Sequence, residues 1–304
     1  MTDKYTRREW AGLALTGLGA LMLPSFLSSC KSMAVAVPPV LKGTLAAKQA
    51  AEIGIVLGAQ TYSFRDHTLD DAIKIMGQLG IRSCELWNGH IQPKTDLKGW
   101  RAKDHTDEMK AIRAKFDAAG ITIMAYTDGF RDNFSEQEIE QVFRIARDLG
   151  TDTITTSATV SVMKRVDVYA KKYKIRVGMH GHSNVNNPNE LSSPDSFARG
   201  MAGCSNYIGI NLDIGHFTAA GFDAIDYIKQ HHDRIYCIHV KDRKKNQGEN
   251  QPLGQGDTPI GPVLRLIRDM HYPIPAHIEY EYKGGDSLVE VGKCLDYCKQ
   301  QLKA

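Results

Sequence analysis

The sequence has almost no excess charge, few cysteines and no glycine-rich phosphate loop. Its 304 residues carry 38 basic and 35 acidic side chains, and the formal charge of +3 is too small to indicate a nucleic-acid-binding protein. None of the six cysteines forms a CxxC zinc pattern, and the odd number that follows Cys30 argues against a full disulfide framework. No GxGxxG or Walker sequence follows the first predicted strand. The remaining composition, 42% hydrophobic and 24% charged, is typical of a folded globular protein and excludes a disordered chain.

The first thirty residues have the pattern of an export signal. Thr6-Arg7-Arg8-Glu9-Trp10 resembles a twin-arginine signal, and the apolar run 11–23 has the length of a signal h-region rather than of a membrane span. Leu27-Ser28-Ser29-Cys30 resembles a bacterial lipobox, in which the cysteine becomes the lipid-modified N-terminus. The three motifs occur in the order that an exported lipoprotein requires.

These motifs predict the organisation of the chain. We expect a signal peptide over 1–29, a lipid-anchored tether over 30–51 and a folded domain over 52–304. The lipid on Cys30 would attach the protein to a membrane, which makes it a periplasmic lipoprotein. The alternative is a plain N-terminal anchor helix.

From residue 53, short apolar and β-branched runs alternate with amphipathic stretches of ten or more residues. The predicted strands are 53–60, 82–87, 121–126, 152–157, 175–180, 208–213, 235–240 and 274–279. Predicted helices follow them near 67–79, 104–119, 135–149, 160–173, 194–202, 222–233, 259–270 and 287–302. Eight such units in about 250 residues predict a single-domain α/β fold, the (β/α)8 TIM barrel. The alternative, a doubly wound open sheet, usually carries the phosphate loop that is missing here.

Polar residues end five of the predicted strands, at the rim where TIM barrels hold their catalytic groups. These strand ends are Glu85, His180-Gly181-His182, Asp213-Ile214-Gly215-His216, His239-Val240-Lys241-Asp242 and Glu279-Tyr280-Glu281. Asp213 follows a mostly apolar strand, where a carboxylate needs a metal or strong hydrogen bonds, and the same holds for His239 and Glu279. Taken singly, Glu85 is equally explained as a salt-bridge partner and His180 as a core histidine.

The strand ends together predict a metal site. Histidine and carboxylate ligands suit Mn²⁺, Mg²⁺, Co²⁺, Zn²⁺ or Fe²⁺. The predicted ligands are His180, Asp213, His239 and Glu279.

The order of these motifs resembles one family. Leu212-Asp213-Ile214-Gly215-His216, His239-Val240-Lys241-Asp242 and then Glu279 look like the xylose-isomerase-like TIM-barrel superfamily, over residues 52–302. That superfamily includes sugar isomerases, ketose 3-epimerases, inosose dehydratases and endonuclease IV. Gly254-Gln255-Gly256-Asp257 resembles its GxGD loop. The resemblance implies that Asp213, His239 and Glu279 bind a divalent metal and that His216 and Lys241 face the substrate.

One position departs from the family pattern. Many isomerases and epimerases have a glutamate at the end of strand five, where this chain has His180. His180 and His182 point to opposite sides of a regular strand, so both can serve one site only if the strand ends between them. We expect His180 to be the metal ligand and His182 to be a substrate contact or base.

The resemblance implies a sugar isomerase or epimerase. Such an enzyme removes a proton next to a carbonyl while the metal stabilises the enediolate that forms. The predicted catalytic groups are Glu279, His182 and Glu85, and the predicted substrate contacts are His216, Lys241, Asp242, Trp87 and Gln60.

Two other functions remain open from the sequence. The missing glutamate and the export signal favour a lyase or hydrolase that cleaves keto-sugars or 3-keto-glycosides by elimination. A non-catalytic carbohydrate-binding lipoprotein is the third reading. The low charge and the export signal argue against a DNA-repair endonuclease and any nucleic-acid partner. The oligomeric state stays open, a homo-oligomer included.

Overall fold

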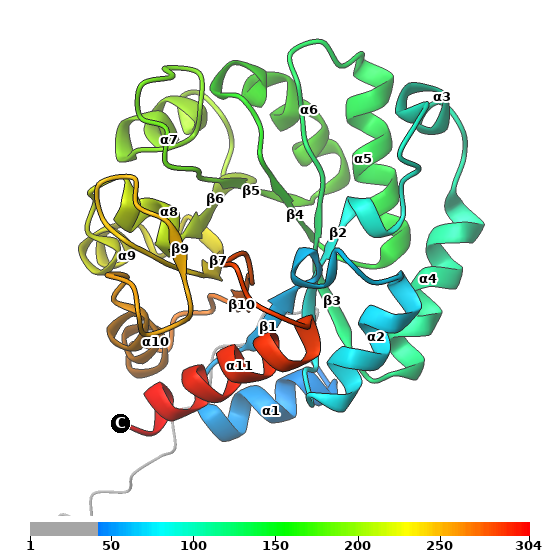
Figure 1. The fold of residues 1–304 in the computed structure, drawn as a ribbon. Helices are drawn as coiled ribbons and strands as arrows, with labels where there is room; N and C mark the ends of the chain where they lie inside the picture. The colour runs from blue at the N-terminus through cyan, green and yellow to red at the C-terminus, as the bar shows by residue number, and fades with distance from the viewer. Residues whose placement is uncertain (1–41) are drawn as a thin grey trace, which may run out of the picture. The chain divides into compact units, whose positions relative to one another are not determined.

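Eight parallel strands close into a barrel, and the helices form a ring around it (Figure 1). The computed structural model describes residues 42–304, so the predicted signal peptide, the lipobox and most of the tether lie outside the described residues. The barrel strands are β1 (Leu57–Gln60), β2 (Ser83–Trp87), β3 (Thr122–Thr127), β4 (Thr153–Thr156), β5 (Arg176–His180), β6 (Ile208–Asp213), β7 (Ile235–Val240) and β10 (Ala276–Ile278). Parallel pairing of β1 with β10 completes the ring. The predicted TIM barrel is therefore confirmed, and the open sheet is excluded.

The outer helices include all eight predicted ones in the predicted order, together with two short helices, α3 (Leu97–Arg101) and α8 (Ile214–Ala219), that were not predicted. The eight predicted helices are α2 (Leu69–Gln78), α4 (Thr106–Ala118), α5 (Glu136–Leu149), α6 (Met163–Tyr173), α7 (Pro194–Met201), α9 (Ala224–His231), α10 (Ile260–Asp269) and α11 (Ser287–Lys303). Their apolar faces pack on the strands around fully buried side chains such as Met109, Phe116 and Phe143. In residues 42–304, no helix has both the length and the apolar composition needed to cross a membrane.

Helix α1 (Leu45–Ile53) occupies the place where we predict the end of the tether and the start of the first strand. It begins at Thr44, whose side chain accepts a hydrogen bond from the Ala47 amide, and ends at Gly54, whose φ of 86° suits glycine. Ala46 and Ala50 are buried in a small apolar cluster beside the barrel. The short alanine side chains hide this helix from a search for apolar periodicity, although alanine favours helix strongly. Residues 45–51 therefore belong to the barrel domain and not to the tether.

Short segments beyond the strand ends build the rim that holds the site. The turns η2 (Thr61–Phe64) and η3 (Asn88–His90) follow β1 and β2, and η4 (Val160–Val162) precedes α6. After β7, the strands β8 (Asp242–Arg243) and β9 (Asn250–Gln251) pair as an antiparallel hairpin. Because all barrel strands are parallel, their last residues gather at this one rim.

Barrel closure brings β1 very close to β2 at Gly58. A Cβ atom at this position would lie 2.2 Å from the Ser83 carbonyl oxygen and 2.9 Å from the His277 ring. Backbone atoms of a paired strand cannot move aside as a flexible side chain does. Position 58 therefore needs a glycine because two strands approach each other closely there. Its backbone angles alone do not require one.

We expect Gly58→Ala to destabilise the protein by at least about 2 kcal/mol, because the added methyl group overpacks the barrel wall. The matched control is Gly77→Ala in α2, where an added Cβ meets no atom within 4 Å. That variant should be more stable than the parent by about 0.5–1 kcal/mol, as alanine is the better helix former. Urea unfolding of both variants measures the change in the free energy of unfolding. Equal changes in the two variants would contradict the close approach at Gly58.

Candidate metal centre

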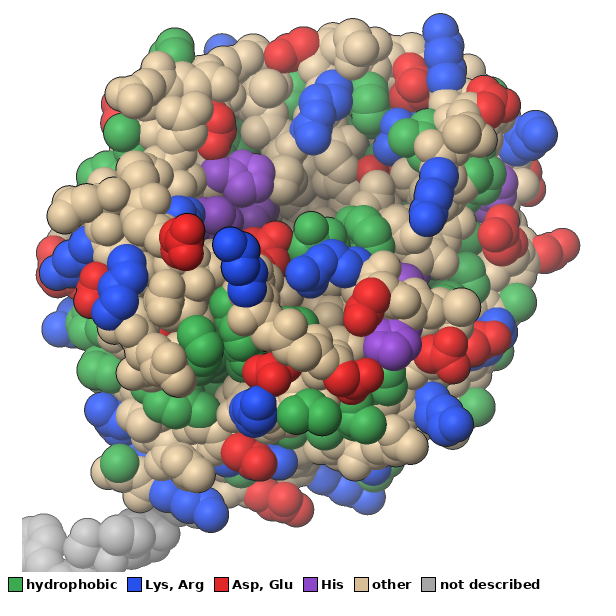
Figure 2. All heavy atoms as spheres, in the orientation of Figure 1, with side chains coloured by type: hydrophobic (Ala, Val, Ile, Leu, Met, Phe, Trp, Pro, Cys, Tyr) green, Lys and Arg blue, Asp and Glu red, His purple; other side chains and the backbone are tan. Residues whose placement is uncertain are grey.

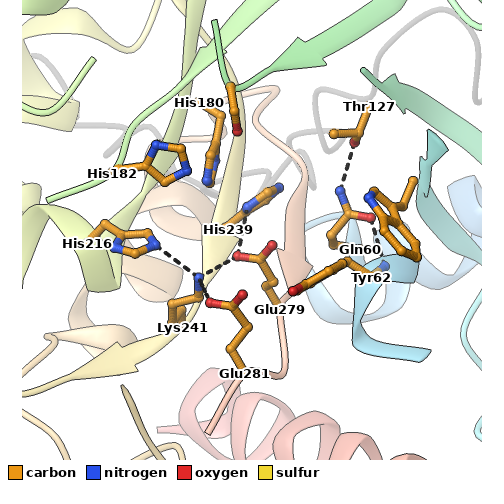
Figure 3. Close-up of a pocket in the computed structure, with 12 residues that line it drawn as sticks. Gln60, Tyr62, Thr127, His180, His182, His216, His239, Lys241, Glu279 and Glu281 are labelled. Atoms are coloured by element: carbon orange, nitrogen blue, oxygen red, sulfur yellow. Dashed lines mark hydrogen bonds and ion pairs between the residues drawn. The ribbon is translucent and has the colours of Figure 1, made fainter. Parts of the chain in front are cut away.

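A cavity of about 350 Å³ opens at the carboxyl ends of the strands. Figure 2 shows histidine side chains gathered at the edge of this hollow, and Figure 3 shows the side chains that line it. The lining consists of Gln60, Tyr62, Trp87, Thr127, Ser157, His180, His182, His216, His239, Lys241, Glu279 and Glu281. Most of the residues predicted from the strand ends therefore meet in one place.

Four of the lining and neighbouring side chains bring buried nitrogen and oxygen atoms together. These atoms are His180 Nδ1, Asp213 Oδ2, His239 Nδ1 and Glu279 Oε2. One ligand atom from each of the four residues lies within 4.8 Å of the others. Asp213 Oδ2 and Glu279 Oε2 are ion-paired with Lys241, whereas His180 Nδ1 is buried without a hydrogen-bond partner. Two nitrogens and two oxygens fit a divalent cation, and these residues are the four ligands predicted from the sequence.

The local structure explains why Asp213 offers one oxygen to the site. Asp213 is the last residue of β6 and the N-cap of α8, and its Oδ1 accepts a hydrogen bond of 2.8 Å from the His216 amide. The same carboxylate therefore ends a strand, starts a helix and keeps Oδ2 for the centre. Burial raises the pKa of Asp213 to about 6, although the Lys241 ammonium opposes this rise.

Lys241 balances the negative charge of the centre. Its Nζ lies 3.2 Å from Asp213 Oδ2, 2.7 Å from Glu279 Oε2 and 2.7 Å from Glu281 Oε2 (Figure 3). Burial works to lower the pKa of Lys241, but these carboxylates raise it above its ordinary value. Burial also works to raise the pKa of Glu279, but Lys241 and His239 hold it well below its usual range. Lys241 is therefore a fixed cation between carboxylates.

The two histidines of β5 divide between the centre and the cavity. The strand ends at His180, so the chain turns before His182 and both rings line the cavity. Their ring centroids lie 5.0 Å apart, edge to face, and only His180 has an atom in the ligand cluster. Burial lowers the pKa of both imidazoles, that of His180 well below its ordinary value. Both rings are therefore in the neutral form, which is the form that binds a metal or takes a proton.

His216 lies between two cations at the edge of the cavity. The Arg243 guanidinium lies 2.7 Å from its Nδ1, and because a guanidinium can only donate, this nitrogen faces a donor. Burial and the Lys241 charge lower the pKa of His216 well below its ordinary value, so the ring stays neutral. Its Nε2 lies beside Lys241 at 3.2 Å.

Gln60 and Trp87, both predicted substrate contacts, line the cavity. Gln60 lies on the side opposite His182 and His216 (Figure 3). Trp87 packs edge to face on Tyr62, with ring centroids 5.0 Å apart. The Gln60 amide donates to Glu85 at 2.9 Å and to Thr127 at 2.8 Å, and its oxygen accepts from the Tyr62 amide. The polar groups of Gln60 are thus engaged within the protein.

Asp242 does not face the cavity, contrary to its predicted role as a substrate contact. It is buried, and its carboxylate accepts hydrogen bonds from the amides of Gly254, Gly256 and Thr258 at 2.8, 2.9 and 3.1 Å. The loop that resembles GxGD is therefore anchored on Asp242. Asp242 fixes the loop after β7. The sequence pattern does not distinguish a strand-end carboxylate with this role from one that binds a substrate.

Glu85, predicted as a catalytic group, has no accessible surface and does not line the cavity. It lies beneath the centre, where its Oε1 is 2.9 Å from His239 Nε2 and its Oε2 is 3.2 Å from His277 Nδ1. This placement does not fit direct contact with a substrate. His277, to which we assign no role from sequence, was detectable by its spacing: it lies two residues before Glu279, on the same side of the last strand.

Glu281, Thr127 and Ser157 also line the cavity without a predicted role. Glu281 is two residues beyond Glu279, and the alternation of side chains again places both toward the centre. Thr127 and Ser157 end or follow β3 and β4, where short hydroxyl residues give no distinctive pattern.

Comparisons with known proteins agree with this architecture. A family model described as xylose isomerase-like TIM barrel matches residues 73–300, whereas a search of curated proteins found no match. A 3-keto-D-glucoside 4-epimerase structure from E. coli is 12% identical, with a TM-score of 0.62 over 81% of this chain and 99% of the other. A D-allulose 3-epimerase from Methylomonas sp. is 13% identical, with a TM-score of 0.61 over 81% and 97%. The IOLI protein, solved with zinc bound, is 14% identical, with a TM-score of 0.59 over 81% and 95%. At such identities the structures share the fold alone.

We expect a divalent cation to stabilise the protein by binding His180, Asp213, His239 and Glu279. At a concentration 100 times the Kd, binding adds about 2.7 kcal/mol, or roughly 5–10 °C in the unfolding midpoint. Thermal unfolding with Mn²⁺, Mg²⁺, Co²⁺ or Zn²⁺, each against a chelator, measures the shift.

Asp213→Asn should lose most of this shift, because an amide is a poorer ligand than a carboxylate. Asp242→Asn is the matched control on the same rim; it should lower the midpoint without metal but keep the metal-dependent shift. Equal shifts in the two variants would contradict the assigned centre.

Proposed function

Because the chain belongs to the xylose isomerase-like TIM barrel family, we propose that it is a divalent-metal-dependent enzyme of the sugar isomerase or epimerase type. The observation that carries the proposal is the convergence of four buried side chains with metal-binding atoms, two histidines and two carboxylates, beside a cavity at the rim formed by the strand ends. His180, Asp213, His239 and Glu279 would hold the metal. When bound, a divalent cation polarises a carbonyl and stabilises the negative charge that develops on its oxygen.

The chain's own residues supply the other parts of such a reaction. His182 is neutral, and 41% of its side chain is exposed, so it can take a proton from the carbon next to a carbonyl. His216, which lines the cavity between Arg243 and Lys241, would contact a hydroxyl group of the substrate. Lys241 forms ion pairs with Glu279 and Glu281 and so keeps both carboxylates in place.

The charges in the cavity favour an unphosphorylated sugar. Of the residues that line it, Lys241 is the one Lys or Arg, and three carboxylates already surround its ammonium. A phosphate would need an uncompensated cation to replace its hydration. The edge-to-face pair of Tyr62 and Trp87 instead offers aromatic surface to the apolar face of a sugar ring.

One observation favours elimination as the second candidate. Among the four ligands, Glu279 and Asp213 are the carboxylates, and the place of a second glutamate is taken by His180. A pair of glutamates on opposite faces, as two-base epimerisation needs, is therefore absent from this ligand set. With a 3-keto-glycoside, the proton at the carbon next to the carbonyl would pass to His182, and the bond to the aglycone oxygen would break as the double bond forms. The aglycone would leave with a proton from the site.

The sequence motifs further support the proposal that the protein is exported and anchored by lipid on Cys30. Twin-arginine signal, h-region and lipobox occur in order over residues 1–30. Unphosphorylated keto-sugars and glycosides are the carbohydrates expected outside the cytoplasm, in agreement with the charges in the cavity.

We expect the metal-loaded protein to exchange the proton next to the carbonyl of an unphosphorylated keto-sugar. Free ketoses and 3-keto-glycosides in D₂O, followed by NMR, provide the measurement. Deuterium in an epimer or isomer supports the first candidate, whereas aglycone release without an epimer rejects it in favour of elimination. Absence of exchange with every keto-sugar would contradict both.

Variants of the two neighbouring histidines test the division of roles. His182→Asn should lower turnover about 10²- to 10⁴-fold, the usual contribution of a general base, and leave the metal Kd unchanged. His180→Asn should instead weaken metal binding. A metal Kd that changes equally in both variants would show that the two rings share one role.

The anchor has its own test in a bacterium that exports folded proteins. We expect Cys30→Ser to move the protein from the membrane fraction to the soluble fraction, since the lipid acceptor is lost. Cys204→Ser, which changes a half-buried free cysteine of the barrel, is the matched control and should stay with the membrane. Equal fractionation of the two variants would reject the lipobox.

A further inference from the structure

Glu85 is the most heavily hydrogen-bonded carboxylate of the described barrel. Its side chain lies at the end of β2 and crosses the barrel interior to β7 and β10, with no accessible surface. Oε1 faces the donors Gln60 Nε2, Thr127 Oγ1, Thr155 Oγ1 and His239 Nε2 at 2.9, 2.8, 2.5 and 2.9 Å. Oε2 faces Cys237 Sγ at 3.4 Å and His277 Nδ1 at 3.2 Å.

This arrangement fits an acceptor and not a donor. Hydroxyl and amide donors from β1, β3 and β4 approach one oxygen, and a thiol and an imidazole approach the other. A buried carboxylate is tolerated when its lone pairs are satisfied in this way. Donors surrounding both oxygens hold the group in one orientation.

The contact with His239 determines which nitrogen of that ring is free. A carboxylate can only accept, so His239 Nε2 carries the hydrogen that points at Glu85. The opposite nitrogen, Nδ1, lies 3.3 Å from Glu279 Oε2 and 4.0 Å from Asp213 Oδ2, and it is the nitrogen that a cation would bind in place of a proton. The side-chain amide of Asn211 also lies 3.0 Å from Nε2. The ring is thus turned and protonated so that Nδ1 faces the other ligand atoms.

We propose that Glu85 is a positioning residue of the metal centre: through His239 Nε2 it holds the imidazole in the tautomer that presents Nδ1 to a divalent cation. The inference rests on the proposed centre and extends it to a residue outside the cavity. A carboxylate behind a histidine ligand also raises the basicity of the ring, and loss of such a partner typically weakens metal binding 10- to 100-fold.

Glu85 could instead be a ligand of a second metal site. Glu85, Cys237 and His277 have one ligand atom each within 4.8 Å of the others and are themselves a possible metal group. Unlike the atoms of the centre above, however, their facing atoms are all hydrogen-bonded to one another. We therefore assign them to the support of His239, and the experiment distinguishes the two.

The experiment measures Co²⁺ and Zn²⁺ affinity by competition with a chromophoric chelator, together with the absorption spectrum of the Co²⁺ protein. Glu85→Gln replaces one acceptor oxygen by an NH₂ donor with little change of shape. We expect its Kd to rise about 10- to 100-fold and the Co²⁺ spectrum to change. Glu290→Gln is the matched control, because it also alters a largely buried carboxylate, one bonded to Tyr282 away from the cavity; its Kd should stay within about twofold of the parent.

A double-mutant cycle separates positioning from a general effect on the fold. In a His239→Ala background, Glu85→Gln should change the Kd less than about threefold, since the ring through which it acts is gone. Equal losses in both backgrounds, or no loss in the parent, would overturn the inference. So would a fall from two bound ions to one, because Glu85 would then be a ligand with Cys237 and His277. If the parent protein binds no divalent cation, the proposed centre itself fails.

Discussion

The need to compensate buried carboxylates governs the interior of this barrel. Asp213, Glu279 and Glu85 are buried, and an unpaired charge at such a position would cost several kcal/mol. The protein meets this need in two ways. Beneath the cavity, neutral donors and a histidine surround Glu85, while at the rim the Lys241 ammonium lies among the acids. Two of these carboxylates, Asp213 and Glu279, converge with His180 and His239 at one point.

The parts of this arrangement that were predictable from sequence are those that depend on alternation along the chain. Strand positions, and hence the rim to which His180, Asp213, His239 and Glu279 belong, follow from apolar runs of regular spacing. The role of Asp242 was not predictable in this way, because hydrogen bonds to Gly254 and Gly256 depend on how a loop returns to the strand. Helix α1 was missed for another reason, as its buried side chains are two alanines that give no periodic signal.

Glu85 also has a feature that could not be predicted from the sequence, although it lies within a strand. Its position at a strand end is visible in the sequence, but its depth in the barrel is not. That depth depends on the neighbouring strands. Gln60 and Thr127, the last residues of β1 and β3, both donate hydrogen bonds to the Glu85 carboxylate. Strand-end position therefore identifies the residues of a catalytic rim, while the division into ligands, supports and loop anchors requires the packed structure.

The residues of the cavity belong to two kinds of segment, which differ in how firmly they are attached to the barrel sheet. The four atoms of the centre come from strand ends that hydrogen bonds tie into the closed sheet. Tyr62 and Glu281 instead lie on the short turn after β1 and in the segment after β10. Mutations in the latter segments can alter what enters the cavity and leave the centre undisturbed. A lineage built on this scaffold can therefore acquire new substrates by gradual change at its periphery while its core chemistry is inherited intact.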